Sequence, residues 1–121
     1  MLRQKTPLGE ITISGEVFTT LAGAAASTCF GVRGMAYRSV SDGLVHLLKR
    51  EVMGKGVRVG YSIDSEKGNS ISVELHIVAK TGVNLPVICS AIIEDVAYKL
   101  TRDTGTKVDA VDVYIDSVMI D

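Results

Sequence analysis

Several residue types are scarce in this 121-residue chain, and their scarcity limits what it can be. It has no tryptophan, two prolines and two cysteines, and aromatic residues make up only 5% of it. The core must therefore be aliphatic. The two cysteines, Cys29 and Cys89, fall on the apolar sides of expected helices, which indicates small buried residues in a reducing compartment. A disulfide or a catalytic thiol is the less favoured alternative.

The sequence also lacks an excess of either charge. Thirteen Lys and Arg residues are balanced by 14 Asp and Glu residues, so there is no overall attraction to nucleic acid or to anionic lipid. The first ten residues lack the apolar run of a secretory signal. No apolar run elsewhere reaches the roughly 18 residues of a membrane-spanning helix. We therefore expect a cytoplasmic protein without direct membrane insertion.

Patterns of reactive residues are missing as well. The two histidines, His46 and His76, have no Cys, Asp or Glu at metal-ligand spacing, and no HExxH, CxxC or phosphate-binding glycine loop occurs. Asp112 and Asp116 share a strand face that could hold a cation weakly, but a solvated edge is the simpler interpretation. We expect no catalytic residue, no metal, no cofactor and no enzymatic activity.

A strand, a turn and a helix between Ile71 and Asp103 form the clearest structural unit. Apolar and polar residues alternate over positions 71–80, as in a half-buried strand. Asn84 is a good N-cap, Pro86 fits the first helical turn, and Gly105 is a typical C-terminal residue. The helix between these caps carries a core-facing stripe, which comprises Leu85, Ile88, Cys89, Ile92, Val96 and Leu100.

The remaining segments complete a two-layer fold. We expect a strand at 8–13, a helix from about 15 to 30, a strand at 35–40, a short helix at 42–52, a hairpin of strands 57–64 and 71–80, the long helix, and a strand at 108–115. The apolar phase of this last strand changes after Asp116, which indicates a bulge or the end of pairing. This order predicts an α+β sandwich with a mixed, mostly antiparallel sheet and two long helices on one face. One domain would cover residues 8–121, preceded by a flexible lead at 1–7.

Two surfaces of this expected fold are candidates for contact. The sheet face turned away from the helices should be polar, and it is a solvated surface by default. Its residues are Arg58, Ser62, Glu74, His76, Asp112, Tyr114 and Asp116. The second candidate is an apolar strip on the long helix opposite the core stripe, which often marks a protein interface. Its residues are Val87, Ala91 and Tyr98, flanked by Glu94 and Arg102. The short helix could cover this strip instead.

A nucleic-acid site is the alternative function. The GVRG run, Gly31 to Gly34, matches the GxxG loop with which KH domains clamp nucleic-acid backbones. Arg33 and Arg38 are the nearby cations. A KH loop joins two helices, whereas this run leads into an expected strand. The simpler interpretation is therefore a helix end followed by a tight entry into the sheet, and nucleic acid is an unlikely partner.

Two long stretches resemble a known family. They are GEITISGEVFTTLAGAAASTCFGVRGM and the segment from KGVRVGYSID through GVNLPVICSAIIEDVAYKLTRDTGTKVDAVDVYIDSV. In order and spacing the chain resembles the alkaline-shock protein family of general and envelope stress proteins, common in Gram-positive bacteria. The resemblance implies a non-enzymatic cytoplasmic protein that self-associates as a homo-oligomer. It also implies docking near the inner face of the membrane through a membrane-anchored partner. The family has no catalytic residues to carry over.

Overall fold

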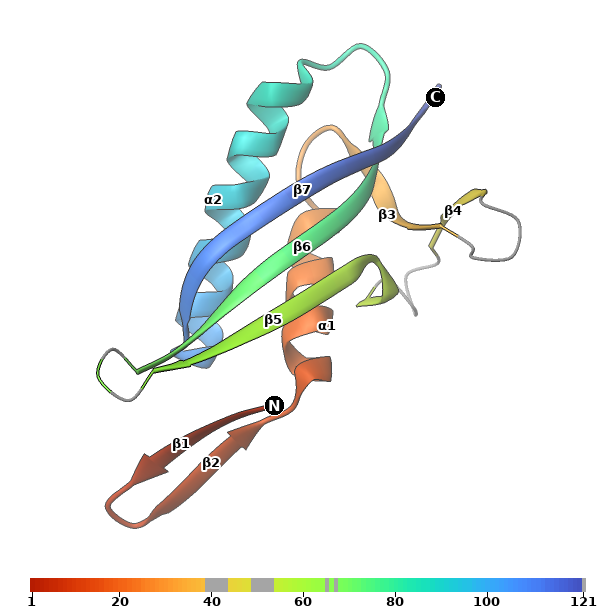
Figure 1. Cartoon of the computed structure of the whole chain (residues 1–121). Coiled ribbons are helices and arrows are strands. Elements are labelled where there is room, and N and C mark those ends of the chain that lie inside the picture. Colours follow the sequence, from red (N-terminus) through yellow and green to blue (C-terminus); the bar gives the residue numbers. More distant parts are fainter. Residues whose placement is uncertain (39–43, 49–53, 65, 67, 121) are drawn as a thin grey trace.

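The computed structural model describes residues 1–38, 44–48, 54–64, 66 and 68–120. Its elements are β1 (Leu2–Thr6), β2 (Gly9–Ile13), α1 (Gly15–Ser27), β3 (Val32–Arg38), β4 (Val45–Leu47), β5 (Val57–Asp64), β6 (Gly68–Lys80), α2 (Leu85–Thr104) and β7 (Lys107–Met119). Both helices lie on one face of the sheet formed by β3 to β7, and the β1–β2 hairpin projects beyond one end (Figure 1). The predicted α+β sandwich with a mixed sheet is confirmed.

Strand β6 is the centre of the sheet. It pairs in parallel with β7 along residues 70–80, which occupies one of its two edges. The other edge is shared, because β5 pairs antiparallel with residues 68–75 and β3 with residues 77–79. Gly56 lies where these two strands meet, and a Cβ there would come within 2.9 Å of the Ala36 carbonyl oxygen. A glycine is therefore needed at this junction.

The core lies between β6 and the two helices. Ile71, Val73, Leu75 and Ile77 of β6 are each at most 2% exposed, as the alternating pattern predicted. They pack in one cluster with Phe18 of α1 and with Ile92, Val96 and Leu100 of the α2 stripe, and Ile88 of the same stripe is also buried. Burying each large apolar side chain contributes about 1.5–3 kcal/mol, so this layer is the main source of stability.

The predicted ends of α2 are also confirmed. The Asn84 side chain accepts a hydrogen bond from the Val87 N–H at 3.3 Å, which satisfies one free donor of the first turn. Gly105 closes the helix with a φ of +68°, and its N–H donates to the Thr101 carbonyl at 2.9 Å. The left-handed conformation favours glycine at this position.

Two bulges in β7 place carboxylates on the face of the sheet away from the helices, here called the open face. The pairing shifts between Ile71 and Ser72, and again between Ile77 and Val78, so Asp109 and Asp116 have no opposite residue on β6. The second shift is the bulge that the phase change after Asp116 predicted. Asp109 accepts a hydrogen bond from the Ser70 hydroxyl, and Asp116 lies against His76.

Two expectations about local structure were wrong. The lead at residues 1–7 is not a flexible segment, because Leu2–Thr6 form a strand that pairs with β2, and Leu2 is buried. Pro7 lies in the hairpin turn, a position that its fixed φ suits, rather than ending a flexible lead. Ile11 of β2 is 49% exposed, since the hairpin extends past the helices.

The second wrong expectation is the short helix at 42–52. Residues Val45–Leu47 form a strand that pairs with Ala36–Arg38 of β3. Residues 42–43 and 49–52 lie outside the described part of the chain, as do residues 39–40 of the expected second strand. Short apolar runs fit a strand or a helix equally well, and pairing with β3 decided this one.

Candidate protein-interaction surface

The predicted strip lies on the side of α2 that faces away from the sheet. Its residues recur every three or four positions, which places them on one face of a helix. They are Val87, Ala91, Glu94, Tyr98 and Arg102. Val87 is 63% and Tyr98 64% exposed, whereas the opposite side of α2 is buried in the core. No residue that the structure describes covers these two side chains.

Tyr98 and Arg102 form the C-terminal end of the strip. The guanidinium carbon of Arg102 lies 5.7 Å from the centre of the Tyr98 ring, and its Nε donates to Asp103 at 2.8 Å. The hydrogen bond with Asp103 raises the pKa of Arg102 and lowers the pKa of the carboxyl group. Tyr and Arg are enriched among the residues that dominate binding at protein interfaces. This end of α2 therefore presents an aromatic ring beside an already paired charge.

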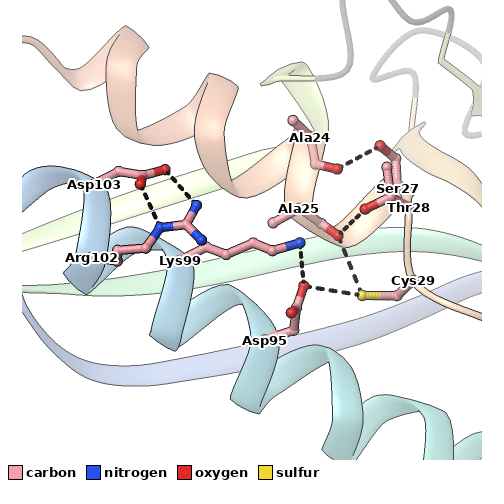
Figure 2. Close-up of polar contacts among 9 residues, drawn as sticks. All are labelled: Ala24, Ala25, Ser27, Thr28, Cys29, Asp95, Lys99, Arg102 and Asp103. Atoms are coloured by element: carbon pink, nitrogen blue, oxygen red, sulfur yellow. Dashed lines mark hydrogen bonds and ion pairs between the residues drawn. The ribbon is translucent and has the colours of Figure 1, made fainter.

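The flank of the strip is held against α1. Asp95 accepts from the Lys99 ammonium at 3.0 Å and lies 3.7 Å from the Cys29 thiol, which reaches across from the end of α1 (Figure 2). The same thiol donates to the Ala25 carbonyl. Burial and the Asp95 carboxylate raise the pKa of Cys29, so the group remains a neutral donor near neutral pH. The contact between Cys29 and Asp95 thus links the end of α1 to α2 beside the exposed strip.

Sequence analysis missed an exposed aromatic residue next to α2. Phe30 follows α1 and is 83% exposed. The next residue, Gly31, has a φ of +85°, and a Cβ there would come within 2.9 Å of the Ile88 side chain. Phe30 is thus at the edge of α2 because its neighbour packs against the helix. An aromatic residue directly before a helix-ending glycine was the signal available in the sequence.

The GVRG run does not form the helix–loop–helix clamp of a KH domain. Gly31 lies in the turn after α1, and Arg33, Gly34 and Arg38 belong to β3. A Cβ on Gly34 would come within 2.8 Å of Leu47, so both glycines serve close packing. The alternative nucleic-acid interpretation therefore loses the local geometry that motivated it.

The residues predicted for the open face carry a connected polar network. The His76 ring lies between Glu74 and Asp116, at 2.9 Å from each, and Arg58 lies 3.9 Å from Glu74. Tyr114 stacks on His76 with its ring centre 4.9 Å away. Sequence analysis placed these residues on one face but missed the bonds among them. The bond between His76 and Asp116 depends on which residue of β7 lies opposite each residue of β6, and the sequence of one strand does not show this register.

The described residues show neither a metal-binding cluster nor a membrane-spanning helix. No group of three or more His, Cys, Asp or Glu side chains among them is arranged to hold a metal ion. None of their helices is long and apolar enough to cross a membrane.

The fold and the exposed strip define a class: small α+β domains with one solvent-exposed helix face. Comparison with known proteins then identifies the family. A family model matches residues 3–120, and the chain belongs to that family, the alkaline-shock protein 23 family, which is described as having a cell envelope-related function. The family resemblance drawn from the sequence is confirmed.

Individual proteins are similar to this chain in sequence or in structure. The chain is 31% identical to the uncharacterized protein YloU of Bacillus subtilis (strain 168), over 96% of this chain and 93% of that protein. It is 33% identical to the uncharacterized protein Spy1614 of Streptococcus pyogenes serotype M6, over 93% of this chain and 89% of that protein. A solved structure of the MamM CTD aligns with a TM-score of 0.48 at 16% identity, covering 89% of this chain and 99% of that chain.

Proposed function

We propose that this protein acts at the cell envelope by self-association and by docking to a partner protein, and that it catalyses no reaction. The observation that carries the proposal is the strip on α2, where Val87 and Tyr98 are each more than 60% exposed on an ordered helix. Exposure of large apolar side chains to water is unfavourable, and burying them in an interface lowers the free energy. The cell envelope-related description of the family supports the setting.

The proposed location is the cytoplasmic side of the membrane, reached through a membrane-anchored partner. The strip offers a mixed contact surface, in which Glu94 and Arg102 are polar groups interspersed among apolar residues. Protein interfaces commonly combine apolar contacts with hydrogen bonds between polar groups. One face of α2 could therefore bind a second copy or the partner in the same way.

Tyr98→Glu tests this surface. A charge at this position would be buried on association, so we expect the self-association constant to weaken at least about 30-fold, the effect of losing an interface hot spot. Sedimentation velocity over a range of protein concentrations measures the change. Ser90→Glu is the matched control, because it adds the same charge to an exposed position of α2 outside the strip.

Each result of this experiment has a definite meaning. A concentration-dependent oligomer in wild type and Ser90→Glu, but not in Tyr98→Glu, supports the strip as the interface. An unchanged oligomer mass in Tyr98→Glu would exclude this surface. A wild-type monomer at every concentration would remove self-association from the proposal. Circular dichroism of each variant confirms that the fold is retained.

A further inference from the structure

His76 lies between two carboxylates on the open face of the sheet. Its Nδ1 is 2.9 Å from Oδ2 of Asp116 on β7, and its Nε2 is 2.9 Å from Oε2 of Glu74 on β6. The Tyr114 ring stacks on the imidazole at an interplanar angle of 11°, which fixes the ring between its two partners. The Asp116 side chain is only 14% exposed and that of His76 28%, so water screens these contacts incompletely.

The geometry requires a particular form of the histidine. Ionised carboxylates accept hydrogen bonds and cannot donate them, so both ring nitrogens must donate for both bonds to exist. Only the imidazolium ion has two N–H groups. The neutral ring has one, and either tautomer leaves a nitrogen lone pair facing a carboxylate oxygen. Loss of one proton therefore removes one charge-assisted hydrogen bond and replaces it with a repulsive contact.

We propose that His76 is a pH-sensitive latch that holds the C-terminal end of β7 against β6. The bond to Asp116 joins the two strands at the bulge, just before Ser117–Met119 pair with Val78–Lys80. Protonated His76 closes the latch, and neutral His76 weakens it. This role does not depend on the strip of α2.

Other charged groups lie near Glu74, one of the two carboxylates that hold the ring. Arg58 of β5 approaches Glu74, and Asp112 of β7 lies opposite Glu74 in the strand pairing. On the side of β3, Gly34 and Met35 pair with Val78 and Ile77, and neither of them titrates. Among the described residues, two carboxylates contact the imidazole directly, and Arg58 and Asp112 lie beside one of them, Glu74.

Beyond its strand pairing with β6, the segment that the latch holds has little side-chain burial to fix it. Val118 is 44%, Met119 37% and Ile120 84% exposed, so few buried contacts resist local opening. The Met119 carbonyl accepts a hydrogen bond from the Thr81 N–H at 3.1 Å, which closes this end of the sheet. Opening the segment would free the β6 edge at residues 78–80, and an unpaired strand edge can accept another strand.

The test is hydrogen exchange by NMR at the Thr81 amide and at the amides of Ser117–Met119. His76→Gln retains a donor but cannot titrate. Dividing the wild-type rate by the His76→Gln rate at each pH removes the base catalysis of exchange. The His76 C2–H signal reports which form of the ring is present at each pH. We expect the ratio of wild-type to His76→Gln exchange rates to be about tenfold higher with a neutral ring than with a protonated one, because one charge-assisted hydrogen bond is lost. Amides in the centre of α2 should show no such change.

Two further variants complete the experiment. His46→Gln removes the other histidine, on β4, and should behave as wild type. Asp116→Asn removes the carboxylate and should abolish the pH dependence while leaving His76 in place. A constant exchange ratio through the His76 titration, or an unchanged pH dependence in Asp116→Asn, would overturn the latch. If His76→Gln does not fold, the wild type compared with Asp116→Asn decides the question by the same readout.

Discussion

The two faces of β6 are built on different principles. On the covered face, Leu75 and Ile77 are fully buried among aliphatic side chains from both helices. On the open face, Glu74 and His76 are half-buried and held by directional bonds to neighbouring strands. The stability that the covered face contributes depends on how much apolar surface is removed from water, and it is distributed over many weak contacts. The open face depends on a few bonds, each sensitive to register and protonation.

The largest effect that separates the two faces is expected from Leu75→Ala. The side chain is fully buried, so its truncation leaves a cavity and should lower the free energy of unfolding by about 2–5 kcal/mol. Ser72→Ala is the matched control on the open face of the same strand, and it should change stability by less than about 0.5 kcal/mol. Urea unfolding of both variants measures the difference. Equal losses would show that the open face contributes as much as the core.

The covered face was the more predictable of the two. The alternation over residues 71–80 and the caps Asn84 and Gly105 are local signals, and each predicted the correct element. The exposure of Val87 and Tyr98 followed from helical spacing alone. The local sequence pattern predicts these features because each of them depends on a single strand or a single helix.

What the sequence did not reveal depends on pairing between distant segments. The bond from His76 to Asp116 exists because a bulge 40 positions later aligns the two, and the period of either strand does not contain that register. The β1 strand was missed because it forms only by pairing with β2. Strand β4 likewise depends on β3, and a three-residue apolar run has no period of its own.

An effect of intermediate size is expected at Cys29, whose thiol is partly buried against the covered layer. Burial first, and the Asp95 carboxylate second, raise the pKa of the Cys29 thiol. The unfolded thiol therefore ionises at lower pH than the folded one, and the contribution of Cys29 to stability is lost as pH rises above the ordinary thiol pKa. Asp95→Asn should lower the pKa of Cys29, because the carboxylate is gone while Lys99, which lowers this pKa, remains.

Alkylation of Cys29 by iodoacetamide measures this shift, since the thiolate is the reacting form. A Cys89→Ser background removes the other thiol. We expect the pH–rate profile of Asp95→Asn to move to lower pH, with a several-fold faster reaction at pH 8. The midpoint should stay above that of a free thiol, because burial persists. A profile identical to that of the parent would show that the contact between Cys29 and Asp95 is not maintained in solution.

The smallest effect, and the only one expected to increase stability, concerns a polar atom at the end of the covered layer. Thr106 is 3% exposed, and its hydroxyl oxygen has no hydrogen-bond partner among the described residues. Thr106→Val replaces the hydroxyl with a methyl group of similar size and removes the desolvation cost of the unpaired group, which is about 1–3 kcal/mol. We therefore expect the free energy of unfolding to rise by about 1 kcal/mol. Thermal unfolding measures the gain, and Thr101→Val on the exposed side of α2, which loses a hydrogen bond to the Ala97 carbonyl, should show none. A loss of stability in Thr106→Val would mean that the hydroxyl is paired in solution, and that the covered layer is as fully satisfied as the network around His76.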